Sequence, residues 1–243
     1  MNPDTLMNYP DLPDRLPAGD MPNTYVDINE EIIRKARILF PYVVEEINEL
    51  NQRKTVISVY GSSGTGKSSI SAVLSRYLSA MNLNTYVLSG DNYPHRIPVY
   101  NDRQRELIYQ EAGEDALAMY LGSEYELNYK EVNGILFEFH TGRDTIFLRR
   151  MGRTPESLYY EPVSFKDVDV LILEWTHGNN PALRGIDIPV YLEGTPEDTL
   201  AARLSRNRDT GIDSPFVSRV LHLEYELLES QRDTAKIILP YKL

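Results

Sequence analysis

The chain has 243 residues, a formal net charge of −11 at pH 7 and no cysteine. This length is sufficient for one large α/β domain with a sizeable core. The lack of cysteine excludes disulfides and thiol catalysis and fits a cytoplasmic location. The acidic balance disfavours nucleic acid or an anionic membrane as the main partner, and the sequence shows no transmembrane run or secretory signal.

The first 53 residues are expected to form an N-terminal arm and a helix. Prolines at positions 3, 10, 13 and 17 interrupt the start of the chain, which predicts an irregular arm over about residues 1–21. The helix is expected to begin after Asp27, with Glu30 completing a capping box, and Pro41 is placed to kink it. This arm and helix could support a homodimer.

Residues 61–68 match the phosphate-binding pattern G-x-x-x-x-G-K followed by Ser or Thr. The glycines allow a tight turn in which backbone N–H groups point at phosphate oxygens. Lys67 is expected to reach the β- and γ-phosphates, and the Ser68 hydroxyl to bind Mg²⁺. The predicted nucleotide site is Gly61, Ser62, Ser63, Gly64, Thr65, Gly66, Lys67, Ser68 and Ser69.

The residues on either side of this loop agree with the motif. A β-rich run over residues 55–60 precedes it, and apolar residues recur at helical spacing over residues 70–81. A strand, a glycine loop and a helix place the helix N-terminus against an anion. The alternative is a Gly/Ser linker that matches by chance, and the flanking pattern argues against it. ATP is the expected nucleotide, with GTP left open.

The rest of the sequence alternates strand and helix patterns. Strands are expected at 85–89, 168–174, 188–192 and 236–239; helices are expected over about 102–120 and 128–140, and from Thr195 and Ser214. A hairpin insertion is expected over about residues 143–163. This order predicts an α/β fold: a P-loop NTPase sandwich of three α/β/α layers with a mostly parallel sheet, plus the hairpin and the N-terminal helical extension.

Two acidic residues follow predicted strands at the edge where open α/β sheets bind ligands. Asp91 follows the strand at 85–89 and could accept a proton from an attacking hydroxyl, or alternatively form an Asx turn. Glu174 ends the strand at 168–174 and could hold Mg²⁺ with Ser68, or alternatively cap a neighbouring helix. His177 is either a phosphate or substrate contact or a satisfied structural group.

Two groups of arginines have less specific patterns. Arg203, Arg206 and Arg208 precede a glycine, which predicts a lid over about residues 203–213 that closes on ATP. In this interpretation Arg206 is catalytic, and Arg203 and Arg208 bind the nucleotide. The alternative is a solvated helix face paired with nearby aspartates. A second group is either an acceptor site or an exposed hairpin; it comprises Arg143, Arg149, Arg150 and Arg153.

With these motifs in this order, the chain resembles the uridine kinase and phosphoribulokinase-like group of P-loop kinases over about residues 54–240. The resemblance rests on the loop at 61–69, on S-G-D-N-Y at 89–93, on I-L-E at 172–174 and on residues 203–209. It implies a kinase domain over residues 54–243 that transfers the γ-phosphate of ATP, with Mg²⁺, to a hydroxyl of a small nucleoside or sugar-like acceptor. Asp91 would be the general base, and Ser68 and Glu174 would organise Mg²⁺.

Two alternatives remain open at this point. The run L-S-G-D-N at 88–92 also resembles adenylylsulfate kinase, which ranks second among kinases. A regulatory nucleotide-binding ATPase without a small-molecule acceptor is the alternative from another class. A guanine-reading Asn-Lys-x-Asp motif is absent from the sequence, and the intact Lys67, Ser68, Asp91 and Glu174 argue against a degenerate fold that only binds ligand.

Overall fold

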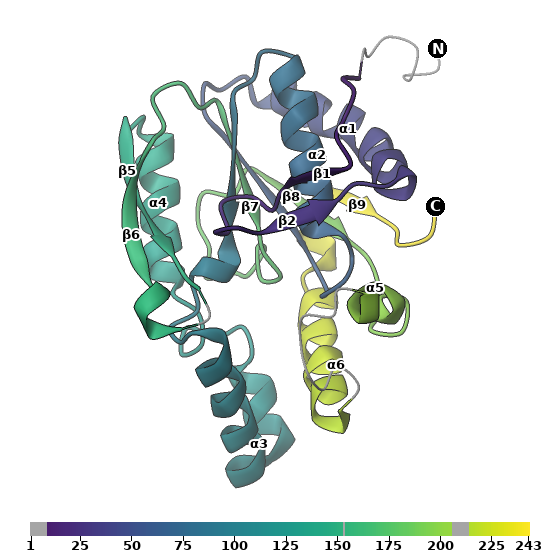
Figure 1. Cartoon of the computed structure of the whole chain (residues 1–243), viewed down its shortest axis with the longest axis vertical. Coiled ribbons are helices and arrows are strands. Elements are labelled where there is room, and N and C mark those ends of the chain that lie inside the picture. Colours follow the sequence, from purple (N-terminus) through teal and green to yellow (C-terminus); the bar gives the residue numbers. More distant parts are fainter. Residues whose placement is uncertain (1–8, 153, 206–213) are drawn as a thin grey trace.

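The computed structural model describes residues 9–152, 154–205 and 214–243. Its centre is a five-stranded sheet in the order β4-β7-β3-β8-β9 (Figure 1). Every neighbouring pair in this sheet is parallel, which confirms the predicted sheet type. The strands are β3 (Thr55–Gly61), β4 (Thr85–Ser89), β7 (Val170–Glu174), β8 (Ile188–Leu192) and β9 (Ile237–Leu239).

Helices cover both faces of the sheet because its strands are apolar on both sides. On one face, α1 (Glu30–Leu50) and α2 (Lys67–Ala80) pack in one core with strand residues such as Ile57 and Val59. On the other face, α4 (Tyr129–His140) packs with Leu171 and Leu173. A hairpin of β5 (Thr145–Arg150) and β6 (Tyr159–Ser164) joins this second core. The predicted α/β fold with three layers is therefore confirmed.

Three further helices lie near the carboxyl ends of the strands. α3 (Pro98–Tyr120) bends at Gly113, whose φ of 82° and ψ of −172° are not helical. It extends away from the sheet beside α6 (Pro215–Glu229), and Leu117, Leu121 and Val220 form the apolar contact near their sheet-proximal ends (Figure 1). The third helix is the short α5 (Leu200–Ser205), and 3₁₀ turns are formed by Gly90–Asn92, Pro155–Ser157 and Arg232–Thr234.

The structure corrects three local predictions. The arm is not irregular throughout, because β1 (Arg15–Pro17) pairs antiparallel with β2 (Tyr25–Asp27). The first helix begins at Glu30, since Asn29 and not Asp27 caps it by accepting a hydrogen bond from the Ile32 N–H. The regular part of the helix expected from Thr195 begins at Leu200, although Thr195 and Asp198 exchange the reciprocal bonds of a capping box and close a turn that leads into it.

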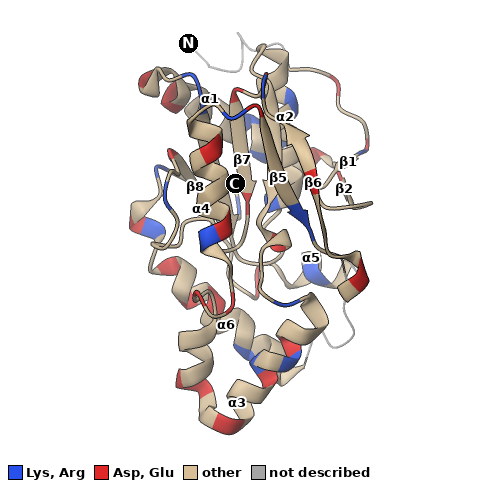
Figure 2. Ribbon diagram, turned by 90° about the vertical axis from the view of Figure 1, so that its left-hand side faces the viewer, with Lys and Arg blue, Asp and Glu red and all other residues tan. Residues whose placement is uncertain are grey.

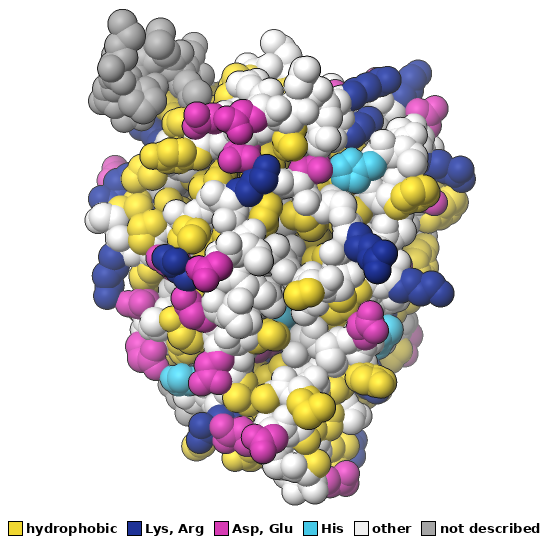
Figure 3. All heavy atoms as spheres, turned by 180° about the vertical axis from the view of Figure 1, so that it is seen from behind, with side chains coloured by type: hydrophobic (Ala, Val, Ile, Leu, Met, Phe, Trp, Pro, Cys, Tyr) yellow, Lys and Arg dark blue, Asp and Glu magenta, His cyan; other side chains and the backbone are white. Residues whose placement is uncertain are grey.

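The surface carries both signs of charge. Figure 2 shows acidic residues along α3 and α6, the helices that extend from the sheet, with basic residues among them on α3. Figure 3 shows acidic and basic side chains interspersed over the opposite face of the molecule from Figure 1. Within the described ranges, none of the helices combines the length and apolar character that a membrane span requires.

Candidate active site

The predicted phosphate loop connects β3 to α2 at the carboxyl edge of the sheet. Gly66 caps α2 with φ of 93°, a left-handed conformation that other residues rarely adopt. The helix begins at Lys67, so the positive end of its dipole lies at the loop. The structure thus places residues 61–66 between a buried strand and a helix N-terminus, an arrangement that can bind phosphate through backbone N–H groups.

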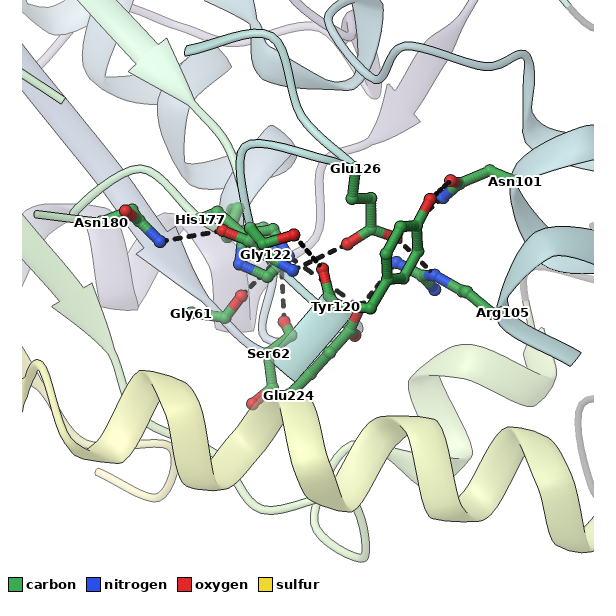
Figure 4. Close-up of polar contacts among 12 residues, drawn as sticks. Gly61, Ser62, Asn101, Arg105, Tyr120, Gly122, Glu126, His177, Asn180 and Glu224 are labelled. Atoms are coloured by element: carbon green, nitrogen blue, oxygen red, sulfur yellow. Dashed lines mark hydrogen bonds and ion pairs between the residues drawn. The ribbon is translucent and has the colours of Figure 1, made fainter. Parts of the chain in front are cut away.

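The ammonium group of Lys67 lies on this loop. Its Nζ donates to the carbonyl oxygens of Gly61 at 2.9 Å and of Ser62 at 3.0 Å, and the residue is 8% exposed. Figure 4 shows Gly61 and Ser62 at this point, beside His177. A buried cation held by loop carbonyls provides the positive charge that a nucleotide phosphate would need.

Glu174 lies at the centre of the same edge. In the sheet register it pairs with Val59 of β3 on one side and with Ser89 of β4 on the other. The residue is buried, with 6% of its surface exposed. The carboxylate is therefore placed between the strand that leads into the phosphate loop and the strand that leads into the turn of Asp91.

Asp91 lies on the 3₁₀ turn Gly90–Asn92, which packs closely on Trp175. A Cβ atom at Gly90 would approach Cγ of Trp175 to 1.9 Å, so only glycine fits there. Asp91 itself is exposed, and among the described residues its carboxylate forms no hydrogen bond or ion pair. The structure therefore does not show the alternative Asx turn, and the carboxylate is accessible to an incoming group.

Arg203 is the part of the predicted lid that the structure describes. A Cβ atom at Gly64 would lie 2.9 Å from Cβ of Thr199 and 3.1 Å from Cγ of Arg203. The Arg203 guanidinium also donates to the Thr199 hydroxyl. This start of the lid therefore lies directly against the phosphate loop. Arg206 and Arg208 lie outside the described residues.

A buried ionic network joins α3, the loop after it and α6 (Figure 4). Arg105 Nε contacts Glu126 at 2.6 Å and its Nη2 contacts Glu224 at 3.0 Å. Glu126 also accepts from the Gly122 N–H at 2.7 Å and from the Asn101 amide at 2.9 Å. Burial alone would raise the pKa of the Glu126 carboxyl, but the Arg105 guanidinium holds this pKa below its usual value. Sequence reasoning missed this network because its members are far apart in the chain.

His177 extends this network toward the phosphate loop. The side chain is buried, and Nε2 lies 3.9 Å from Glu224 Oε1. Burial lowers the pKa of His177, against the opposing charges of Glu224 and Glu126, and the Lys67 charge lowers it further. This environment favours the structural interpretation of His177 over a direct substrate contact.

The hairpin arginines differ from the expected exposed pattern. Arg149 and Arg150 are both buried, although they are adjacent in β5. Arg149 Nη1 lies 3.9 Å from Glu131 Oε2, and Arg150 contacts Asp20 at 2.6 Å and Glu161 at 2.7 Å. The alternative of an exposed hairpin with arginines in water is therefore wrong for these two. No pattern in the sequence of the arm marked Asp20 as a buried partner.

Comparisons with known proteins agree with this architecture. Residues 53–118 match the adenylylsulphate kinase family model, a stretch that includes the phosphate loop and the turn of Asp91. The bifunctional alpha-galactosidase/sucrose kinase AgaSK of Mediterraneibacter gnavus is 43% identical over 206 residues. That alignment covers 85% of this chain and 22% of the relative, so the chain spans about a fifth of that protein's length.

Two solved structures share the fold. A candidate fructose transport system kinase from Silicibacter sp. TM1040 superposes with a TM-score of 0.63 at 19% identity, covering 85% of this chain and 98% of that one. A possible uridine kinase from Bacillus stearothermophilus superposes with a TM-score of 0.56 at 15% identity, covering 86% and 99%. The chain therefore has the P-loop kinase fold, and its predicted resemblance to the uridine kinase group, with adenylylsulfate kinase as the second likeness, is confirmed.

Proposed function

We propose that this protein is an ATP- and Mg²⁺-dependent kinase that phosphorylates a hydroxyl group of a small carbohydrate, with sucrose as the foremost acceptor. The observation that carries the proposal is the arrangement of one sheet edge. There the phosphate loop with its buried Lys67, the buried Glu174 and the exposed Asp91 follow neighbouring strands. A nucleotide and an acceptor hydroxyl could meet at this edge.

The acceptor is inferred from the relative whose name includes a sucrose kinase. That name also includes an alpha-galactosidase, and the chain covers only 22% of that protein. The phosphate loop favours the kinase activity of that relative, because such a loop binds nucleotide phosphates, whereas glycoside hydrolysis typically uses a pair of carboxylates flanking the sugar bond.

The residues at the site fit a nucleotide with Mg²⁺. Loop N–H groups, Lys67 and Arg203 would bind the phosphates, and the Ser68 hydroxyl and Glu174 carboxylate would hold Mg²⁺ directly or through water. Hydroxyl and carboxylate oxygens are ligands that Mg²⁺ prefers, and the metal would offset phosphate charge. Among the described residues no group of three or more Asp, Glu, His or Cys side chains is arranged to hold a metal ion, which suits a metal bound largely by phosphates and water.

Asp91 is the proposed general base. As the acceptor oxygen attacks the γ-phosphorus, its proton passes to the Asp91 carboxylate, the new O–P bond forms and the bond to the β-phosphate oxygen breaks. ADP leaves with that oxygen. The lid arginines, including Arg206 and Arg208, would stabilise the charge on the transferring group.

Adenylylsulfate is the second candidate acceptor, because the family model that matches residues 53–118 is that of adenylylsulphate kinase. This match covers the nucleotide side and the turn of Asp91 but not the hairpin or α6. A regulatory ATPase without an acceptor would show ADP release that no acceptor stimulates. A cytoplasmic location, where ATP is available, and a homodimer are compatible with the proposal.

The test is ADP release from Mg-ATP with sucrose, glucose, fructose, uridine and adenylylsulfate in parallel, with mass spectrometry of the product. We expect sucrose to give the largest stimulation and a product heavier by one phosphoryl group. Stimulation by adenylylsulfate or uridine alone would replace the carbohydrate with that acceptor. ATP binding without stimulation by any acceptor would favour the regulatory ATPase.

A further inference from the structure

The N-terminal arm reaches the turn that carries Asp91. Leu16 and Ala18 are buried in the core that also contains α1 and α2. At Gly19, with φ of 56°, a Cβ atom would lie 3.1 Å from the carbonyl oxygen of Val87 in β4. The arm therefore runs against β4, and the next residue, Asp20, lies at the carboxyl end of that strand.

The Asp20 carboxylate accepts four hydrogen bonds there. Oδ1 accepts from the Ser89 N–H at 2.7 Å and from the Asn92 amide at 3.3 Å. Oδ2 accepts from Arg150 Nη1 at 2.6 Å and from the Tyr86 hydroxyl at 3.1 Å. One oxygen thus binds the strand end and the turn, and the other binds the hairpin and the strand.

The partners of Asp20 also contact one another. Tyr86 accepts from Arg150 Nη2 at 3.0 Å, and Asn92 Oδ1 accepts from the Met151 N–H at 2.9 Å. The turn Gly90–Asn92 is consequently held between the arm and the end of β5. Asp91, at the centre of this turn, is the exposed residue between the buried Gly90 and Asn92.

Burial makes the charge at Asp20 dependent on these donors. Its side chain is 6% exposed and that of Arg150 is 5% exposed. Burial raises the pKa of the Asp20 carboxyl, while Arg150, the Ser89 N–H and the Tyr86 hydroxyl oppose that rise. Among the described residues, removing the charge would leave Glu161 as the one charged partner of the Arg150 guanidinium, and the hairpin would lose its ion pair with the arm.

We propose that Asp20 is a positioning residue for phosphoryl transfer: it fixes the Gly90–Asn92 turn, and with it Asp91, against the hairpin, so that the N-terminal arm forms part of the acceptor side of the site. This inference rests on the proposed kinase function. It follows because a base must be held within hydrogen-bond reach of the acceptor, and a misplacement of about 1 Å can cost about 10²-fold in rate. The contacts of the phosphate loop do not involve Asp20.

The test compares Asp20→Asn with Asp27→Asn. The first variant keeps an acceptor oxygen for Ser89 but turns an amide donor toward Arg150 and Tyr86. The second makes the same chemical change in the same arm at an exposed carboxylate, whose side chain is 87% accessible and forms an ion pair with Arg15. We expect Asp20→Asn to lower kcat/KM for the acceptor by about 10- to 100-fold with ATP affinity unchanged, and Asp27→Asn to equal the wild type.

Two further measurements separate positioning from general stability. Hydrogen exchange in Asp20→Asn should rise over residues 86–93 and stay unchanged over the phosphate loop. In a cycle with Arg150→Gln, the double variant should lose no more activity than the worse single variant, because both changes break the same contact. If Asp20→Asn does not fold, Tyr86→Phe removes one donor to Asp20 and should lower acceptor kcat/KM by a few-fold.

The outcomes distinguish this inference from the proposed function. Equal acceptor kcat/KM and equal exchange in Asp20→Asn and Asp27→Asn would overturn the positioning role while the kinase function stands. Equal losses in ATP affinity and acceptor kcat/KM would also overturn it, because the effect would then be general. If the wild type transfers phosphate to no acceptor, the kinase function fails. Unchanged hydrogen exchange over residues 86–93 in Asp20→Asn would then also show that Asp20 does not hold the Gly90–Asn92 turn.

Discussion

A buried ionic network lies on each of the two sides of the candidate site, and the central residues of the two networks carry opposite charges. On the acceptor side one carboxylate, Asp20, receives donors from β4, the turn and the hairpin. On the phosphate side one cation, Arg105, bridges the two carboxylates Glu126 and Glu224, with His177 beside them. The first network holds a loop against the sheet, whereas the second holds α3 and α6 together.

This difference predicts different consequences when each side is changed. The acceptor network contacts the turn of Asp91 directly, so its loss should alter the reaction more than the fold. The phosphate-side network joins α3 to α6 next to the phosphate loop. Removal of Arg105 would leave the buried carboxylates of Glu126 and Glu224 without their charged partner from α3. Its loss should therefore alter the fold more than the reaction.

Lys67→Ala should have the largest effect on activity and should leave both networks in place. The substitution removes the ammonium group that lies on the loop carbonyls of Gly61 and Ser62. We expect acceptor-stimulated ADP release to fall to background, because no other described residue contributes a buried cation to these carbonyls. The measurements are ADP release and the melting temperature of the variant, with Lys236→Ala as the control. Undiminished turnover would contradict the role of the loop.

Asp91→Asn should have the next largest effect and should distinguish the two sides directly. We expect kcat to fall by about 10²- to 10⁴-fold, since an amide cannot accept the proton, while ATP affinity stays the same. Steady-state kinetics with calorimetric ATP titration would measure both quantities. Asp167→Asn, an exposed aspartate before β7, is the control. A loss of ATP affinity instead would place Asp91 on the phosphate side.

The same two sides differ in how far the sequence predicted them. The phosphate loop lies in one contiguous stretch with a fixed pattern, and the strands at 85–89 and 188–192 were predicted with the bounds that β4 and β8 have. Short apolar runs and glycine spacing are local signals, so they can be interpreted without knowledge of the fold.

The ionic networks could not be predicted, because their partners are distant in the chain. Asp20 meets Arg150 across 130 positions and Arg105 meets Glu224 across 119. A charged residue in a proline-rich arm or on a helix is more often solvated, so nothing local marks it as buried. For the helix expected from Thr195 the local signal is present, because Thr195 and Asp198 exchange capping hydrogen bonds, but regular helix begins only at Leu200.

Arg105→Met tests the phosphate-side network through stability. Breaking this buried pair leaves Glu126 and Glu224 unneutralised, and we expect the free energy of unfolding to fall by about 3–5 kcal/mol. Urea unfolding would measure the change. The control is Arg219→Met, which breaks an exposed contact to Glu114 between the same two helices and should cost about 0–1 kcal/mol. Equal effects of the two variants would contradict the importance of the buried network.

His177→Gln is expected to have the smallest effect and tests the same network through pH. Burial lowers the pKa of His177 in the fold below its ordinary value of 6.5, so the folded protein holds a neutral ring where the unfolded chain binds a proton. Below about pH 6.5 the unfolded chain therefore binds more protons, and stability falls as pH falls, by at most about 1.36 kcal/mol per pH unit from this residue.

The glutamine variant should lose this part of the slope between about pH 6.5 and 5, whereas the exposed His222→Gln should retain it. Unfolding curves across that range would decide, and an unchanged slope in His177→Gln would show that the buried ring is already protonated, which would make it a charged partner of Glu224.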